Sequence, residues 1–386
     1  MSVSTSVFSF PTTTLFGPGT ISELPVRLRE LKINRPLVVT DPGLLPTESF
    51  RLLQKSLGAD KQGIGWLVFS SVQPNPIEQN VIAAAAAFGE GNCDGIIAFG
   101  GGSALDVGKA IRLLIKKPDF KLDEFRFDDD WKGLAPCVCV PTTAGTGSEV
   151  GRSSVIIIDS TQRKTVFFHP ELLADLVILD PELTRGLPPN LTAATGLDAL
   201  THCVESFTSP VFHPFCDGIA LEGIYQIAGA LPRAFRNGHD LEARGQMLVA
   251  AAMGAIAFQK DLGATHSMAH PLSSICGMHH GTANAECLPT VMKFNARRRP
   301  GLYRRVGLAC GLDVVRVKDD EADILTINYV LDFIRLLGLN RGLYAFGVKE
   351  SQISLLAEQA ILDSCHRTNP VPVTLEDMKA LYLAAL

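Results

Sequence analysis

The sequence contains no CxxC pair, no long run of one charge sign and no apolar run long enough to cross a membrane. Its nine cysteines are scattered, and a chain of 386 residues does not need disulfide bonds, so we expect reduced thiols in the cytoplasm. The first ten residues have neither a basic region nor a long apolar stretch, which argues against a signal peptide. The longest apolar run, residues 247–258, is well short of a membrane span.

The charge balance also excludes some classes of partner. Charged residues make up 19% of the chain and give a formal net charge of -5, so nothing indicates binding to nucleic acid or to a membrane surface. Hydrophobic residues make up 46%, which is a globular composition. The length exceeds that of one ordinary domain, and we therefore expect two domains with separate cores.

The first half of the chain alternates between short β-branched runs and segments of helical length. A strand predicted over residues 95–99 leads directly into three glycines, and a helix is predicted over 104–116 after them. Strands separated by helices indicate a parallel α/β sheet that is covered on both faces. The other predicted elements are strands at 36–40, 66–69, 137–140, 155–158 and 176–179 and a helix at 77–88.

After Pro188 and Pro189 the pattern becomes helical, with segments at 191–207, 216–230 and 241–259. Thr374 is a plausible N-cap for a last helix, because acidic residues follow it in the first turn. We therefore predict a Rossmann-like α/β domain over residues 1–186 and an all-helical domain over residues 187–386.

Histidines and a carboxylate recur at helical spacing in the second half. Asp198 and His202 are four residues apart, His266 and His270 repeat that spacing, and His280 follows. Residues four apart emerge on one face of a helix, and imidazoles with one carboxylate suit iron(II), zinc or cobalt. A single pair of this kind is more often a solvated helix face. Spacing therefore leaves a metal site and a structural role both open, and it does not separate His280 from the adjacent His279.

Three glycines, Gly100–Gly102, and Ser103 lie between the predicted strand and helix. Backbone N–H groups without neighbouring Cβ atoms can approach a pyrophosphate at a helix N-terminus. The alternative is an ordinary turn, with Ser103 as N-cap and Asp106 closing a capping box. The pattern is not the GxGxxG of dinucleotide-binding Rossmann folds.

The helical half resembles the second domain of the iron-containing (group III) alcohol dehydrogenases. The resemblance lies in DALTH, HSMAHPL and HGTANA, at residues 198–202, 266–272 and 280–285. It implies one divalent ion, Fe²⁺ or Zn²⁺, with four ligands: Asp198, His202, His266 and His280. It places His270 beside the ion without binding it, while His279 departs from a proline that is frequent in the family.

Two loops of the first half are similar to the same family, as GGGSALDVGK at 100–109 and PTTAGTGSE at 141–149. The resemblance implies that NAD is the cofactor. Its pyrophosphate is assigned to Gly101, Gly102 and Ser103. The adenosine and phosphate side is assigned to Thr142, Thr143 and Thr146.

Four more residues are assigned to the cofactor. Asp41 ends a predicted strand, where a carboxylate accepts hydrogen bonds from ribose hydroxyls and repels a 2′-phosphate, although it also suits a turn. The family likeness of this position favours NAD over NADP. Asn75 matches a family asparagine that faces the cofactor, and Lys164 matches a family lysine near the nicotinamide ribose. Leu179 is also expected to contact the cofactor.

The expected activity is that of an NAD-linked, metal-dependent alcohol dehydrogenase that interconverts a small primary alcohol and its aldehyde. His270 is the expected proton relay, because imidazole titrates near working pH. Arg152 either pairs with the anionic end of an ω-hydroxy acid or phosphonate or is a surface arginine. Phe258 and His213 are candidates for the substrate pocket.

Two other functions fit parts of the pattern. Glycerol dehydrogenase-like and dehydroquinate synthase-like proteins share the two-domain architecture and a divalent metal, but they use other ligand patterns. A non-catalytic nucleotide-binding protein with structural histidines would contain no stoichiometric metal. Because family members are often dimers or larger, the resemblance also implies a homo-oligomer.

Overall fold

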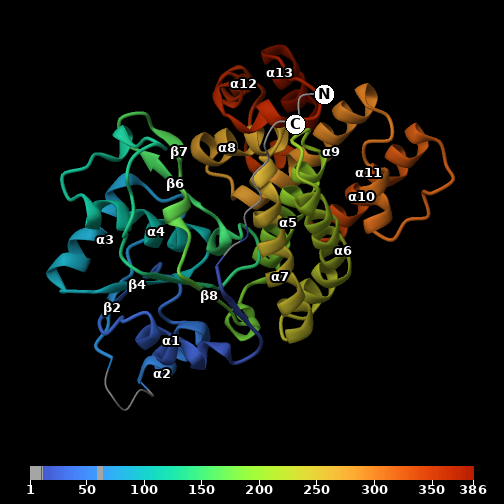
Figure 1. The fold of residues 1–386 in the computed structure, drawn as a ribbon. Helices are drawn as coiled ribbons and strands as arrows, with labels where there is room; N and C mark the ends of the chain where they lie inside the picture. The colour runs from blue at the N-terminus through green and yellow to red at the C-terminus, as the bar shows by residue number, and fades with distance from the viewer. Residues whose placement is uncertain (1–9, 11, 59–63) are drawn as a thin grey trace. The chain divides into compact units, whose positions relative to one another are not determined.

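The structure is a computed structural model that describes residues 10, 12–58 and 64–386. The chain forms two compact units. One comprises Pro11–Leu187 with Gly238–Leu248, and the other is built mainly from Pro188–Asn237 and Val249–Leu386. The first holds the strands and the second is helical, so the expected fold class is confirmed: a parallel α/β part and an all-α part (Figure 1).

In the described residues, the first unit contains a six-stranded sheet in the order β1-β8-β5-β4-β2-β3. Every pair in it is parallel. The strands are β1 (Thr14–Phe16), β2 (Pro36–Val39), β3 (Leu67–Phe69), β4 (Gly95–Gly100), β5 (Cys137–Pro141) and β8 (Leu176–Leu179). The four residues of β2 and the six of β4 are all buried, which is typical of strands covered on both faces.

Helices cover both faces of this sheet. Their bounds are Leu24–Glu30 for α1, Glu48–Gly58 for α2, Glu78–Glu90 for α3 and Gly102–Lys116 for α4. Leu28 of α1 and Leu53 of α2 share a core with Ile97 and Phe99 of β4. On the other face, Gly108 of α4 packs directly on the intervening residue Ala98.

A second, two-stranded sheet corrects one prediction. The predicted strand 155–158 forms as part of β6 (Ser153–Ile158), but it pairs antiparallel with β7 (Arg163–Phe168) and does not join the parallel sheet. The connection at 159–162 is a tight turn with Gln162 at φ 55°, too short for the crossover that parallel pairing requires. β7 was not predicted, because its first half is polar and its residues are mostly exposed or half-buried. β1 was also not predicted.

The helical unit follows the predicted pattern with shifted ends. Its elements are α5 (Pro189–Thr208), α6 (Pro214–Arg236), the second half of α7 (Leu241–Ala257), α8 (Ala264–Cys276), α9 (His280–Arg298), α10 (Arg304–Ala309), α11 (Asp319–Leu336), α12 (Ile353–Leu362) and α13 (Leu375–Ala385). α6 continues past the predicted end despite a proline inside it. The predicted N-cap Thr374 is confirmed, since its side chain accepts from Asp377 N.

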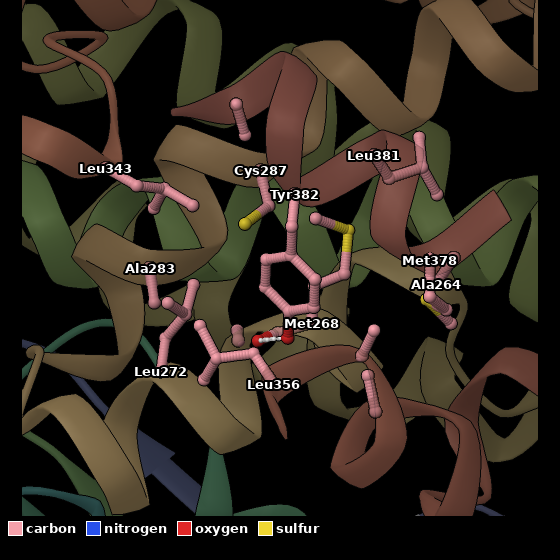
Figure 2. Packing of buried hydrophobic residues seen from close by; sticks show 14 of the residues in the cluster. Ala264, Met268, Leu272, Ala283, Cys287, Leu343, Leu356, Met378, Leu381 and Tyr382 are labelled. Carbon is pink, nitrogen blue, oxygen red and sulfur yellow. Dashed lines mark hydrogen bonds between the residues drawn. The ribbon is translucent and has the colours of Figure 1, made fainter. Parts of the chain in front are cut away.

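Buried apolar residues of α8, α9, α12 and α13 form one core in this unit (Figure 2). Tyr382 of α13 lies in its middle, beside Leu272, Cys287 and Leu356. Its hydroxyl donates a 2.7 Å hydrogen bond to the carbonyl of Met268. Because Met268 lies between His266 and His270, this packing holds the helix segment that carries both histidines.

The nine cysteines are free thiols. Within the described residues, no single helix has both the length and the hydropathy of a membrane span. The bent pair Leu241–Lys260 and Ala264–Cys276 meets that test only when its two segments are counted together.

Candidate metal centre and nucleotide loops

Four side chains of the helical unit converge on one carboxylate oxygen. Asp198 Oδ1 lies 4.0 Å from His202 Nε2, 3.8 Å from His266 Nε2 and 3.6 Å from His280 Nε2. Asp198 and His202 share one face of α5, His266 lies in the first turn of α8, and His280 begins α9. Asp198, His202 and His266 are buried, with exposed fractions of 4%, 3% and 1%.

These distances fit a divalent ion. Donor atoms about 2.1 Å from a tetrahedral ion are about 3.4 Å apart, close to the spacings measured here. Asp198, His202 and His266 alone offer three donor atoms within 4.8 Å of one another. Imidazole nitrogens and a carboxylate are the donor types that such an ion takes in proteins. The residues present therefore fit the metal that the sequence pattern indicates.

Asn284 contacts the same donors and was not singled out from the sequence. Its amide nitrogen donates to Asp198 Oδ1 at 2.6 Å and lies 3.2 Å from both His266 Nε2 and His280 Nε2. The side chain is fully buried. Its position four residues after His280 on α9 was the available signal, since it places both on one helix face.

Glu205 is a second residue that the sequence pattern did not single out. It lies seven residues after Asp198 on α5, so it continues the face that carries Asp198 and His202. His266 Nδ1 donates to Glu205 Oε2 at 2.6 Å. Burial would raise the pKa of the Glu205 carboxyl, but the hydrogen bond and charge of His266 outweigh it, and the pKa lies below its usual value.

His270 lies beside these residues and has its own carboxylate partner. Its Nδ1 is 2.7 Å from Asp363 Oδ2, and its ring stacks on His280 with centroids 5.3 Å apart. Asp363 also accepts from Ser267 Oγ and from Cys365 N, both at 2.9 Å. Burial opposes ionisation of Asp363, yet its contacts with His270 hold the carboxyl pKa well below the usual range.

Three further residues of this unit have defined positions. The exposed His279 is the N-cap residue of α9 and gives no side-chain cap. Phe258 packs edge-on against His202, with ring centroids 5.3 Å apart. His213 caps α6 by accepting from Cys216 N at 3.2 Å, and burial lowers the pKa of its imidazole.

In the sheet unit, the glycine loop and the threonine loop lie against each other. Gly100 has φ +149°, which L side chains rarely adopt, and its carbonyl accepts from Thr142 N at 2.9 Å. A Cβ added to Gly101 would lie 3.4 Å from Thr143, and one added to Gly102 would overlap Thr146 Oγ1. The absence of side chains therefore allows the loops after β4 and β5 to meet.

The capping box considered for α4 is wrong. The N-cap is Gly101, no side chain caps the helix, and Ser103 lies inside the first turn. Asp106 instead accepts from Ser148 Oγ at 2.5 Å and from Val155 N at 3.1 Å. The first-turn N–H groups of α4 thus have no capping side chain to compete with an anion.

Lys109 of α4 further anchors the loop after β5. It is fully buried, pairs with Asp106 at 3.6 Å, and donates to the carbonyls of Ser148, Gly151 and Ser153. Burial raises the pKa of the neighbouring Glu149 carboxyl to about 7. The aspartate and lysine of the GGGSxxDxxK pattern therefore hold the PTTxGTGSE loop in place.

Asp41 follows β2 and reaches the glycine loop. Its Oδ1 accepts from Gly43 N at 2.9 Å, so the turn role is present. Its Oδ2 lies 3.6 Å from the position of a Cβ on Gly100. The chain leaves β2 toward β3 on one side, whereas from β4 it continues to β5 on the other, so the strand order reverses between β2 and β4. Ligands of open α/β sheets bind at this reversal.

The remaining predicted cofactor residues lie at other places in the sheet unit. Asn75 has φ +55° in the loop before α3, and the neighbouring Pro76 carbonyl accepts from Ile157 N of β6. Lys164 is opposite Ile157 in the β6–β7 pair. Leu179 ends β8 with its side chain buried. Arg152, just before β6, is half-buried, and burial lowers the pKa of its guanidinium.

Comparisons with known proteins cover almost the entire chain. Residues 11–181 match the family described as iron-containing alcohol dehydrogenase, and residues 192–386 match the C-terminal part of the Fe-containing alcohol dehydrogenase family. The chain is 40% identical to 4-hydroxybutyrate dehydrogenase of Cupriavidus necator over 94% of its length and 95% of that protein.

Solved structures show the same similarity in three dimensions. A 1,3-propanediol oxidoreductase has a TM-score of 0.94 and 33% identity, with 99% of this chain and 100% of that chain covered. A sulfoacetaldehyde reductase from Bifidobacterium kashiwanohense, in complex with NAD⁺, has a TM-score of 0.87 and 28% identity, with 99% of each chain covered.

Proposed function

This chain belongs to the iron-containing alcohol dehydrogenase family, and on that premise we propose which of its residues carry the reaction. It is an alcohol oxidoreductase that interconverts a small alcohol and its aldehyde with NAD and a divalent metal. We propose that residues 1–186 form the domain that binds the dinucleotide. Residues 187–386 then form the domain that binds the metal.

The proposed ligands of the divalent ion, Fe²⁺ or Zn²⁺, are Asp198, His202, His266 and His280. The observation that carries this proposal is the convergence of three imidazole nitrogens on Asp198 Oδ1 at 3.6–4.0 Å. A divalent ion held there supplies Lewis-acid chemistry, which lowers the pKa of an alcohol and polarises an aldehyde carbonyl. Asn284 supports the arrangement by donating to the aspartate.

Seven of the proposed cofactor contacts follow β2, β4 and β5, next to the reversal of strand order. Gly101, Gly102 and Ser103 offer backbone N–H groups at the uncapped start of α4 to the pyrophosphate. Thr142, Thr143 and Thr146, on the adjoining loop, serve the adenosine and phosphate side. Asp41 accepts from the adenosine ribose hydroxyls and thereby disfavours NADP. The other proposed contacts are Asn75, Lys164 and Leu179.

A panel of alcohols and aldehydes tests the activity. The protein is purified without oxygen, reconstituted with iron(II) or zinc, and assayed by nicotinamide absorbance. We expect substrate-dependent reduction of NAD by alcohols, oxidation of NADH by aldehydes, and loss of both after chelation. Turnover that is unchanged after complete removal of the metal would contradict the proposal.

We propose that His270 carries the proton between the alcohol oxygen and solvent. The Asp363 carboxylate accepts from His270 Nδ1, so it fixes the ring and leaves Nε2 to exchange a proton. General acid–base groups of this kind contribute about 10²–10⁴ in rate. Its ring also stacks on the proposed ligand His280, which supports a role close to the ion.

His270→Ala is therefore expected to keep its metal and lose about 10²–10⁴ in turnover, with an altered dependence on pH. Metal analysis and turnover measured across a pH series check this. His279→Ala removes an exposed neighbouring histidine and is the matched control, for which parental turnover is expected. An unchanged pH profile in His270→Ala would argue against the relay.

We propose further that the natural alcohol carries an anionic group at its far end, as an ω-hydroxy acid does. Two similar proteins are named for substrates with an acid group, 4-hydroxybutyrate and sulfoacetaldehyde. Arg152 follows the PTTxGTGSE loop, and its half-buried guanidinium suits a carboxylate or sulfonate.

Arg152→Ala is expected to lower kcat/KM for 4-hydroxybutyrate about 10–100-fold, because the substrate would lose one charge-assisted hydrogen bond. For 1-butanol, which has no anionic end, the change is expected to stay within about threefold. Steady-state kinetics on the two alcohols decide the matter. Equal losses on both would remove Arg152 from substrate recognition.

The proposed location is the cytoplasm, and the proposed assembly is a homo-oligomer of two or more chains. The nine free cysteines support a reducing compartment. Light scattering of the purified protein measures the assembly.

A further inference from the structure

Glu205 of α5 is a buried carboxylate outside the proposed ligand set. Its exposed fraction is 5%, yet both of its oxygens are engaged. Oε2 accepts from His266 Nδ1 at 2.6 Å and from Gly263 N at 3.1 Å, and Oε1 accepts from Thr265 N at 2.6 Å. One side chain therefore holds both the ring of His266 and the backbone from which that ring projects.

The hydrogen bond to the ring decides which nitrogen carries the proton. An ionised carboxylate only accepts, so the proton of a neutral His266 is on Nδ1 and its lone pair is on Nε2. Nε2 is the atom that lies 3.8 Å from Asp198 Oδ1. A metal-binding histidine needs its unprotonated nitrogen directed at the ion, and a carboxylate on the other nitrogen secures this.

The surrounding backbone is shaped to accept the Glu205 charge. Buried carboxylates are costly unless several donors surround them, and the N–H groups and dipole at the start of α8 provide such donors. Gly263 is the N-cap of α8, and a Cβ added there would lie only 2.7 Å from Glu205 Oε1. The missing side chain thus permits the carboxylate to approach the helix end.

We propose that Glu205 is a positioning residue, which fixes the tautomer and orientation of His266 for a divalent cation. This inference rests on the proposed ligand set. It differs from a purely structural role, in which Glu205 would only cap α8 and stabilise the fold, without a direct effect on cation binding.

Glu286 offers a matched control for the structural role. It is also buried, at 3% exposed, and it also holds a backbone loop. Its oxygens accept from Asn340 N at 2.7 Å and from Arg341 N and Gly342 N at 2.9 Å. Glu286→Gln therefore removes a comparable buried charge without acting on His266.

The experiment measures cobalt(II) affinity by chelator competition in the full-length metal-free parent, Glu205→Gln and Glu286→Gln, together with the cobalt visible spectrum. An amide in place of Glu205 can donate to Nδ1, which moves the ring proton onto Nε2 and opposes metal binding. We expect affinity about 10–100-fold weaker in Glu205→Gln, with an altered spectrum. Glu286→Gln is expected to keep the parental spectrum and affinity within about twofold.

Parental cobalt affinity and spectrum in Glu205→Gln would overturn the inference, as would equal weakening in both variants. Absence of stoichiometric cobalt in the parent would instead contradict the ligand set itself. If Glu205→Gln does not fold, NMR of the parent protein with ¹⁵N-labelled histidines determines which ring nitrogen of His266 carries the proton. In the metal-free parent, the proton of neutral His266 is expected on Nδ1, beside Glu205, with the resonance assigned through His266→Gln. A proton on Nε2, beside Asp198, would overturn the inference.

Discussion

The His266→Ala variant is expected to lose its bound metal and at least about a thousandfold in turnover, because Lewis-acid stabilisation contributes several kcal/mol. The substitution removes one of four proposed ligands. It also leaves Glu205 buried without its imidazole partner, although the N–H groups of Gly263 and Thr265 still neutralise part of that carboxylate. Metal analysis of the purified variant and its turnover with NAD give the two readouts.

NAD binding is the control for this variant. The proposed nucleotide contacts all belong to the sheet unit, whereas His266 belongs to the helical unit. The dissociation constant for NAD is therefore expected to remain within about threefold of the parental value. A change of that size is smaller than the effect of losing one hydrogen bond to a charged group. A variant with full activity, or with one equivalent of tightly bound metal, would rule out His266 as a ligand.

The second large effect is expected for Gly102→Ala. Its new Cβ would overlap Thr146 Oγ1 and lie 3.1 Å from two carbon atoms of the same side chain. The threonine loop must then move away from the start of α4, which costs about 1–3 kcal/mol. We expect NAD to bind about 10–100-fold more weakly, because the distortion affects both loops that are proposed to contact the cofactor.

Titration calorimetry with NAD and metal analysis measure this effect. Gly89→Ala is the matched control, because it lies inside α3 and its Cβ would meet nothing within 4 Å. It is expected to leave NAD affinity unchanged and to stabilise the fold by about 0.5–1 kcal/mol. Gly102→Ala should retain its metal. Parental NAD affinity in Gly102→Ala would contradict the role of the glycine loop.

Part of the site could be predicted because it depends on the spacing of residues that are close together in the sequence. Asp198 and His202 are one helix turn apart, so a helical segment alone brings them to one face. The family resemblance then selected His266 and His280, which spacing alone did not. The glycine loop was visible for the same local reason, as three glycines between a strand and a helix.

The rest depends on contacts between distant segments. Asp363 meets His270 across 93 positions of sequence, and only the packing of α8 near α12 brings them together. The same cause explains the wrong capping box, because the Asp106 carboxylate accepts from Ser148, which is 42 residues away in sequence. The strand at 155–158 was assigned to the wrong sheet because a tight turn follows it and pairs it with β7. The β-branched residues of the strand do not indicate that turn.

The proposed metal centre holds one divalent ion, bound by residues of α5, α8 and α9. Diffraction data from crystals of the metal-loaded protein, collected on both sides of the iron or zinc absorption edge, locate such an ion directly. We expect one anomalous peak per chain, about 2.0–2.2 Å from Asp198 and from Nε2 of His202, His266 and His280. No peak there, or a peak among His270, Asp363 and Cys365 instead, would contradict it.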